Sequence, residues 1–327
     1  QTLQDIGCEV YKLKGVWIRS PKDFFDYRKA LNNFFSSHHD YKVVHMHSSS
    51  KNYSVLEFAK KYGVPIRIAH SHNIDFQTKN KIKKHIGDIF KIPLKYYSTD
   101  YFACSKLAGE WLFGDKIVNS NKFRIIHNAI DYDKFKYNEE IRNKIRKELE
   151  INDDEIIIGH VGRFTNQKNH DFLIDIFYEC YKQNGKYKLL LVGTGELENK
   201  IKEKVNNYGI TKNVIFLGFK NNVCDYMQAM DCFVMPSLYE GLPVVAIEAQ
   251  ASGLPCFMTK DVVTDEVRII KSVTFISLSS SAYEWSQFIN KLINDIDRCD
   301  TLKDFKREKY LIEDTIKELE DFYLNVI

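Results

Sequence analysis

The sequence predicts an α/β protein of two successive domains, each with a parallel sheet between layers of helices. Strand-sized apolar runs alternate with amphipathic helical segments, and the alternation restarts near residue 156. The 327 residues are enough for two domains of ordinary size, each with its own core. Two such domains facing each other would form a cleft at the carboxyl ends of their strands, where open α/β sheets bind ligands.

The first half of the chain supplies the elements of the first domain, expected over residues 1–135. Amphipathic segments predict helices at 21–35, 53–62, 79–95 and 106–113. Apolar runs predict strands at 8–13, 42–47, 66–70, 101–104 and 123–127. A connection follows near residues 131–140.

The second half supplies the second domain, expected over residues 136–300. Strands are predicted at 156–161, 187–192, 214–217, 232–235 and 255–258. Helices are predicted at 171–181, 196–208, 223–230 and 244–252. The tail from residue 281 is charged, lacks Pro and Gly, and has a helical pattern. Its last part, 301–327, is a carboxy-terminal helix that can cross back to the first domain.

Composition narrows the class of protein. The hydrophobic content of 44% and the aromatic content of 13% are typical of a folded globular chain. The seven cysteines are scattered without a CxxC spacing, which favours a reducing compartment over a disulfide framework or a zinc site. The apolar runs are too short to span a bilayer, and the start of the sequence lacks the layout of a secretory signal. We therefore expect a cytoplasmic location.

Charge is unevenly distributed along the chain. Residues 1–135 carry 22 Lys and Arg against 13 Asp and Glu, whereas the whole chain has a net charge of only +3. The densest basic segment is 79–95, where Ile82, Ile86, Ile89 and Phe90 recur at helical spacing between lysines. Such a helix can lie on the anionic inner face of a membrane, or it can be a domain helix with a solvated lysine face. No recognisable nucleic-acid module accompanies the charge, so nucleic acid is not expected as a partner.

The most informative motif is residues 236–248, Pro-Ser-Leu-Tyr-Glu-Gly-Leu-Pro-Val-Val-Ala-Ile-Glu. Gly241 permits a close approach of backbone to ligand, and Pro243 suits the first position of the following helix. The start of that helix, near Gly241 and Leu242, offers free N–H groups and a positive dipole end to a phosphate. Glu240 and Glu248 would flank this position, separated by roughly 10 Å along a helix-like rise. A nucleotide-sugar has the matching layout, with hydroxyls at both ends and a diphosphate between.

Three further strand ends carry residues suited to such a donor. Gly162 is followed by two cations, Arg163 and Lys168, which can wrap a diphosphate together with backbone N–H groups. Gly193 and Gly195 form a glycine-rich turn between a strand and a helix, which is a weak phosphate-loop pattern by itself. Phe219 is either a neighbour of the nucleotide base or an ordinary core residue.

Histidines mark the ends of two strands in the first half. His45 and His47 form one pair, and His70 and His72 form another. The members of each pair are two residues apart, so their side chains lie on the same side of a strand. Two histidines alone rarely hold a metal, and neither an acid nor a cysteine lies at a useful spacing.

The segment around Glu240 and Glu248 resembles the Glu-x7-Glu signature of family 4 of the retaining glycosyltransferases, and the resemblance covers nearly the whole chain. It implies the GT-B fold, with two Rossmann-like domains facing across a cleft. The family's usual first strand and Gly-Gly loop have no counterpart, so roughly 60 to 80 residues of the first domain are expected to be missing. The closest similarity is to bacterial capsule and exopolysaccharide enzymes.

The resemblance also implies roles for individual residues. Arg163 and Lys168 would stabilise the departing nucleotide, Glu240 would hold the donor sugar, and Glu248 would hold the ribose. The backbone at Gly193 and Gly195 would run close to the donor. One histidine at the end of the strand near residue 70 would donate to the sugar and act catalytically; His72 is favoured narrowly over His70. The family does not need a metal ion or another cofactor.

A second segment of the chain resembles the family's interdomain hinge. It comprises residues 126–135, in which His127 and Ala129 replace the usual Pro and Gly. Asp131 and Asp133 within it match the Asp-x-Asp that binds manganese in the other glycosyltransferase architecture. The hinge explains these residues, so no metal site is expected here.

The resulting hypothesis is a retaining enzyme that moves a sugar from a UDP-sugar, or a GDP-sugar, to a saccharide or polyprenyl-linked acceptor. It would act in surface polysaccharide synthesis, in the cytoplasm and peripherally on the inner face of the membrane. A UDP-sugar 2-epimerase has the same architecture and would need no acceptor. A non-catalytic nucleotide-sugar binder is the alternative from a different class.

Overall fold

The structure is a computed structural model that describes residues 3–13, 20–73, 81–260, 262, 265–293, 298 and 300–326. Contacts divide the chain into two compact units. Unit 1 comprises Gln1–Ile126 together with Leu319–Ile327, and unit 2 comprises His127–Glu318. The division therefore falls after Ile126, whereas the sequence predicted a domain boundary after residue 135. The last helix is divided between the units.

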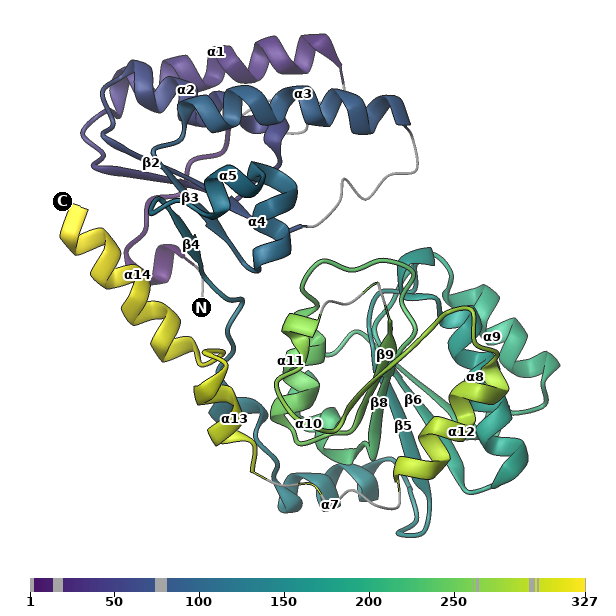
Figure 1. Ribbon diagram of the computed structural model, residues 1–327. Helices are drawn as coiled ribbons and strands as arrows, with labels where there is room; N and C mark the ends of the chain where they lie inside the picture. Colours follow the sequence, from purple (N-terminus) through teal and green to yellow (C-terminus); the bar gives the residue numbers. More distant parts are fainter. Residues whose placement is uncertain are drawn as a thin grey trace. The chain divides into compact units, whose positions relative to one another are not determined.

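Unit 1 contains a sheet of four parallel strands in the order β1-β2-β3-β4 (Figure 1). The strands are β1 (Val43–Met46), β2 (Ile66–Ser71), β3 (Asp100–Ala103) and β4 (Phe123–Ile125). The helices are α1 (Pro21–Ser37), α2 (Ser54–Lys61), α3 (Lys81–Tyr97), α4 (Lys106–Phe113) and the short α5 (Asp115–Val118). Helix α1 begins where the sequence predicts, because Ser20 and Asp23 form a capping box before Pro21.

The carboxy-terminal helix α14 (Ile312–Val326) ends against the sheet of unit 1. Phe322 packs into a cluster with Ile68 of β2, Phe102 of β3 and Ile126. The opposite face of the sheet is covered by a separate cluster that includes Leu56 of α2 and Leu94 of α3. Both faces of these short strands are therefore buried, as expected for a parallel sheet.

Unit 2 contains six parallel strands in the order β10-β9-β8-β5-β6-β7. The strands are β5 (Ile156–Val161), β6 (Tyr187–Val192), β7 (Val214–Gly218), β8 (Cys232–Met235), β9 (Cys256–Thr259) and β10 (Val273–Ile276). Chain order reverses between the adjacent strands β5 and β8, which is the strand order of a doubly wound sheet. The predicted α/β class with parallel sheets is thus confirmed.

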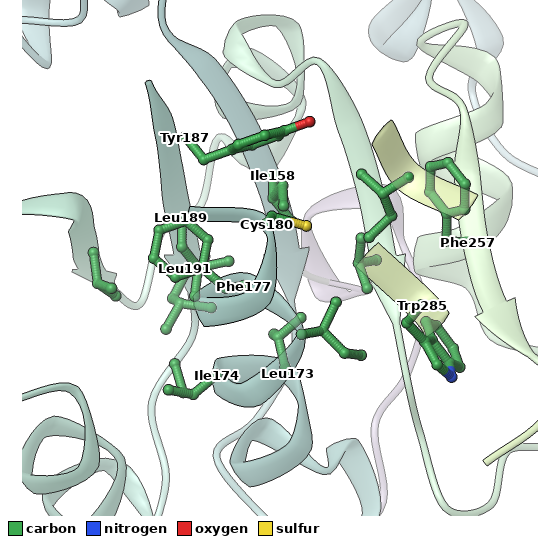
Figure 2. Close-up of a cluster of buried hydrophobic side chains, with 14 of the residues drawn as sticks. Ile158, Leu173, Ile174, Phe177, Cys180, Tyr187, Leu189, Leu191, Phe257 and Trp285 are labelled. Atoms are coloured by element: carbon green, nitrogen blue, oxygen red, sulfur yellow. The ribbon is translucent and has the colours of Figure 1, made fainter. Parts of the chain in front are cut away.

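Helices cover both faces of this sheet (Figure 1). The larger helices are α8 (His170–Gln183), α9 (Glu198–Asn207), α10 (Val223–Ala229), α11 (Val244–Ala251) and α12 (Ala282–Ile293). The remaining helices of unit 2 are α6 (Tyr132–Phe135), α7 (Glu139–Glu148) and α13 (Leu302–Arg307). Figure 2 shows the core beneath α8, in which Phe177, Leu189 and Trp285 are completely buried. Burial of each such side chain contributes about 1.5–3 kcal/mol, so this core fixes the strands whose ends carry the candidate residues.

One predicted strand is absent, and one observed strand was not predicted. Residues 8–13 form no strand, and Val10 and Tyr11 are exposed, because the sheet of unit 1 offers this segment no neighbour. Conversely, Val273–Ile276 forms β10, which pairs with β9 and extends the sheet beyond its last predicted strand. The run Val-Thr-Phe-Ile has the β-branched and aromatic composition of a strand and could have revealed it.

Candidate functional site

Four loops meet at one edge of the sheet in unit 2. They follow β5 (162–169), β6 (193–197), β7 (219–222) and β8 (236–243), and these strands are parallel neighbours. Parallel strands present their carboxyl ends at the same edge, so the four loops gather there. The loops after β5 and β8 flank the point where chain order reverses, which is where doubly wound sheets bind ligands.

Glycines allow these loops to pack directly on each other. A Cβ atom on Gly193 would lie 2.1 Å from the carbonyl oxygen of Gly162, and Gly193 has φ +136°. A Cβ atom on Gly195 would lie 2.6 Å from the carbonyl oxygen of Phe164. Backbone atoms cannot move aside as a flexible side chain can, so both positions require glycine. Close packing of loops thus explains Gly193 and Gly195 even without a ligand.

Hydrogen bonds join the loop after β5 to the loop after β8. The backbone N–H of Leu238 donates to the carbonyl of Gln167 at 2.8 Å. The side chain of Asn169 donates to the carbonyl of Pro236 at 3.0 Å, and that of Gln167 donates to the carbonyl of Tyr239 at 3.0 Å. The two loops therefore form one connected surface at the point where chain order reverses.

This connection brings Lys168 and Glu240 together. Lys168 Nζ lies 2.7 Å from Glu240 Oε1, and Gln167 Nε2 donates to Glu240 Oε2 at 3.1 Å. Glu240 is only 8% exposed, so the cation and the amide compensate the burial of its charge. Each carboxylate oxygen still has a lone pair for a further donor such as a sugar hydroxyl.

The neighbouring candidates differ in exposure. Arg163 is exposed, and its guanidinium has no ion-pair partner within the described part of the chain. Phe219 is 73% exposed, so the interpretation of Phe219 as a core residue is wrong. Gly241 is half-buried and Leu242 is buried. An unpaired cation and an exposed aromatic ring at strand ends are both free to contact a ligand.

Helix α11 begins at Val244, the first residue of the predicted range 244–252, so Pro243 does not take the first helical position that was expected of it. Pro243 is its N-cap, with ψ 102°, and Val244 is the first helical residue. Glu248 therefore stands at the start of the second turn, and its side chain is half-buried. Burial raises the pKa of Glu248, and the nearby Lys134 opposes that shift. Asp131 caps α6 and Asp133 pairs with Lys136, so both carboxylates interact with residues close to them in the sequence.

In unit 1 the two histidine pairs form one group. The parallel register of β1 and β2 sets His45 opposite Ile68, so His47 and His70 follow side by side. His45 Nε2 lies 3.1 Å from His70 Nδ1, and His47 Nδ1 lies 2.8 Å from His72 Nε2. In the sequence the two pairs lie far apart. In the structure the pairing of β1 with β2 brings all four imidazole rings into contact.

Burial favours the neutral form of three of these histidines. It lowers the pKa of His45 to about 3 and that of His70 to about 2, and the neighbouring histidines add to both shifts. The pKa of His47 is also lowered. His70 is buried, whereas His72 is half-buried and His47 is exposed, so the group reaches from the core to the surface.

Three residues that matter to these sites were not singled out from the sequence. Gln167 and Asn169 lie beside Lys168 in the motif, where their amide groups were a visible signal. Tyr323 donates to or accepts from His45 Nδ1 at 2.6 Å. No sequence pattern links residues so far apart, and only the return of α14 to the sheet of unit 1 reveals the contact.

Comparisons with known proteins identify relatives of this chain. The family model described as Glycosyl transferases group 1 matches residues 141–309. A protein named glycosyltransferase EpsF from Bacillus subtilis is 31% identical over 88% of this chain and 75% of its own length. An Escherichia coli UDP-Gal:alpha-D-GlcNAc-diphosphoundecaprenol alpha-1,3-galactosyltransferase is 28% identical over 67% of this chain and 58% of its own length.

Solved structures show the same fold. The crystal structure of HepE from Anabaena in complex with UDP superposes with a TM-score of 0.75, covering 91% of this chain and 82% of HepE at 16% identity. Sucrose-phosphate synthase from Thermosynechococcus elongatus gives a TM-score of 0.74, covering 93% of this chain and 78% of the synthase at 18% identity. The predicted GT-B fold class is thereby confirmed.

Proposed function

The chain belongs to the glycosyl transferases group 1 family, and on this premise we propose that it moves a hexosyl group from a nucleotide-sugar in surface polysaccharide synthesis. The observation that carries the proposal is the contact of Lys168 with Glu240 where chain order reverses in unit 2. A UDP-sugar is the favoured donor, because the Escherichia coli relative is named for a UDP-Gal donor and HepE was solved with UDP.

The acceptor is a saccharide or a lipid-linked saccharide. The name of the Escherichia coli relative specifies a diphosphoundecaprenol-linked GlcNAc, which belongs to this class.

The donor is held by charge and by backbone at the carboxyl edge of the sheet. Lys168 and Arg163 bind the diphosphate, and the exposed Phe219 contacts the base. Glu240 accepts hydrogen bonds from the sugar, and Glu248 accepts them from the ribose. Without donor, Lys168 neutralises Glu240; when the diphosphate enters, the lysine is shared between the two anions.

Transfer proceeds with retention at the anomeric carbon. Breaking the bond between C1 and the phosphate oxygen leaves positive charge on the sugar and negative charge on the diphosphate. Lys168, Arg163 and the N–H groups at the start of α11 stabilise that negative charge, which is electrostatic catalysis. These cations provide the positive charge that a metal would otherwise supply, so the transfer is independent of metal. A histidine of unit 1, His72 or His70, donates to the sugar.

Contact with an anionic membrane is the second part of the proposal. No helix among the described residues combines the length and apolar composition needed to cross a bilayer. Helix α3 instead exposes Ile82 at 72%, Ile89 at 52% and Ile92 at 70% of their surfaces, next to lysines. Phe90, predicted on the same stripe, is half-buried and packs near Tyr53. An exposed apolar stripe beside lysines suits a leaflet of anionic lipid.

Vesicle sedimentation tests the membrane contact. The wild-type chain is expected to bind vesicles of phosphatidylglycerol and to remain in solution with phosphatidylcholine. The double variant Ile82→Glu, Ile89→Glu should bind the anionic vesicles at least about tenfold more weakly, because charge on the apolar face opposes insertion. Ile316→Glu, on the exposed surface of α14, is the matched control. Equal binding by all three proteins would refute the contact.

A panel of nucleotide-sugars tests the transfer itself. A bound donor raises the melting temperature by mass action, so at least one UDP- or GDP-sugar should produce a shift. The same donor should then lose its sugar to a saccharide or lipid-linked acceptor, and Glu240→Gln should abolish turnover. Absence of any shift with the whole panel would refute the donor assignment. Isomerisation without an acceptor would instead indicate an epimerase, and an unaltered biological role in Glu240→Gln would indicate a binding protein.

A further inference from the structure

The side chain of His160 joins the two strands between which chain order reverses in unit 2. The backbone register of β5 with β8 ends at Gly159, opposite Phe233. One residue further along each strand, His160 Nδ1 donates to the carbonyl of Val234 at 2.8 Å. The hydrogen bonds described above join the loops themselves, whereas this one joins the strand ends from which the loops start. The imidazole therefore extends the pairing of the two strands by one position.

This bond fixes the tautomer of His160. A carbonyl oxygen can only accept, so Nδ1 carries the proton, and burial together with His170 lowers the pKa of the ring. The neutral ring leaves Nε2 with a lone pair that is buried and has no hydrogen-bond partner in the described part of the chain. A buried nitrogen without a partner is costly, and an apolar side chain would avoid that cost. The bond to Val234, rather than packing, therefore accounts for a histidine here.

The same ring borders the loop after β5. A Cβ atom on Gly162 would lie 3.0 Å from His160 Nε2 and 3.1 Å from Lys168 Cγ, so the ring and the lysine stem adjoin one small space. His170, the first residue of α8, packs edge-on against His160 with ring centroids 4.7 Å apart, and it stacks on Phe164 at 4.1 Å. Close-packed interiors transmit displacement, so a shift of the imidazole would reach both ends of this loop.

We propose that His160 is a positioning residue that sets the separation of Lys168 from Glu240. These two side chains stand on the loops after β5 and β8, so their 2.7 Å contact depends on how closely the two strand ends approach. The bond from His160 to Val234 holds that approach. A misplacement of about 1 Å at a reacting group can cost 10²-fold in rate. The effect on turnover rests on the proposed sugar transfer, whereas the geometry can be measured without a donor.

Nitrogen NMR of the purified full chain tests the geometry. The ring of His160 in the ¹⁵N-labelled protein is assigned by the signals that disappear in His160→Leu. At pH 7 this ring should carry its proton on Nδ1, because the carbonyl of Val234 accepts from that atom. Free neutral histidine prefers the proton on Nε2, so the expected tautomer is distinctive. A proton on Nε2 would overturn the proposal.

Turnover tests the effect on the charged site. His160→Leu removes the donor at similar side-chain size and should lower kcat at least about tenfold, with KM for the donor changed less than about threefold. His160→Asn places an amide nitrogen where the ring has Nδ1 and should recover most of that loss. Ile158→Val, buried on the same face of β5, is the matched control and should retain the wild-type kcat. Unchanged kcat in His160→Leu, no recovery in His160→Asn, or an equal loss in Ile158→Val would each overturn the proposal.

A double-mutant cycle separates this inference from the proposed function. In the Lys168→Ala background, His160→Leu should lower kcat by less than about threefold, because the residue through which it acts is absent. In urea unfolding, Lys168→Ala should change the unfolding constant by a factor at least about threefold smaller in His160→Leu than in the wild type. Independent effects in both cycles would overturn the inference and leave the sugar transfer intact. A wild type that is inactive with every donor would refute the transfer, and the unfolding cycle would still decide the role of His160.

Discussion

The strand ends of the two units carry opposite kinds of chemistry. In unit 2 the polar residues are charged and belong to loops, and Lys168 and Glu240 meet because backbone hydrogen bonds join two of those loops. In unit 1 they are neutral histidines on the strands themselves, brought together by the register of β1 and β2. A group fixed by loops can rearrange around an entering anion, whereas a group fixed by strands is rigid and suits a single hydrogen bond.

Among the variants that test this difference between the two units, removal of Lys168 should have the largest effect. If the charged edge of unit 2 stabilises the departing nucleotide, Lys168→Ala should lower kcat about 10²–10³-fold, the range found when one transition-state donor is lost. Arg163→Ala, in an exposed position, should weaken UDP binding roughly tenfold. Lys182→Ala removes a surface pair with Glu179 and a cation–π contact with Tyr178, both within α8, and should leave turnover unchanged. Steady-state kinetics with the best donor would decide; normal kcat in Lys168→Ala contradicts the role.

Phe322→Ala tests how α14 supports the histidine face of unit 1. The side chain is 8% exposed and packs among Ile68, Phe102 and Ile126, so its loss should cost about 3 kcal/mol of unfolding free energy. Leu324→Ala, two residues later and 72% exposed, is the matched control and should cost little. Urea unfolding gives both values. A small cost for Phe322→Ala would mean that the end of α14 is not essential to the packing of unit 1.

Gly193→Ala tests whether the loops of unit 2 depend on their close packing. The new Cβ would lie 2.1 Å from the carbonyl oxygen of Gly162, at a φ of +136° that only glycine adopts readily, so a loss of about 2–3 kcal/mol is expected. Gly185→Ala is the control, since a Cβ there meets nothing within 4 Å. Comparing the urea midpoints of the two variants measures the difference. Equal midpoints would show that the two loops can move apart without a loss of stability.

Mild acid should destabilise unit 2 through a neutral buried histidine. Burial, aided by Lys168, lowers the pKa of His170 from 6.5 to about 4, so between these values the unfolded chain binds the extra proton. Stability from this residue is nearly complete above about pH 7.5 and falls by about 1.6 kcal/mol on going from pH 6.5 to 5.0. His170→Phe should reduce that dependence in urea unfolding at the two pH values. A variant that keeps the full dependence would assign it to other groups.

Much of the fold could be predicted because strand and helix patterns are local properties of the chain. The run at 156–161 became β5, and Pro21 with its preceding Ser20 set the start of α1, since periodicity and capping act within a few residues. The same local rules identified Lys168 and Glu240 as residues that an anion or a sugar would need. They could not show that the two side chains touch.

The sequence by itself determined the succession of elements, the loops that carry charge and the strands that end in histidine. Tertiary structure decided the features that depend on pairing between distant segments. These are the lack of a strand at 8–13, the addition of β10 to the sheet, and which face of α3 is exposed to solvent. It also decided the meeting of His45 with His70 and with Tyr323. The physical reason is that hydrogen bonding within a turn or a helix is encoded locally, whereas strand register and packing between distant segments depend on the whole folded unit.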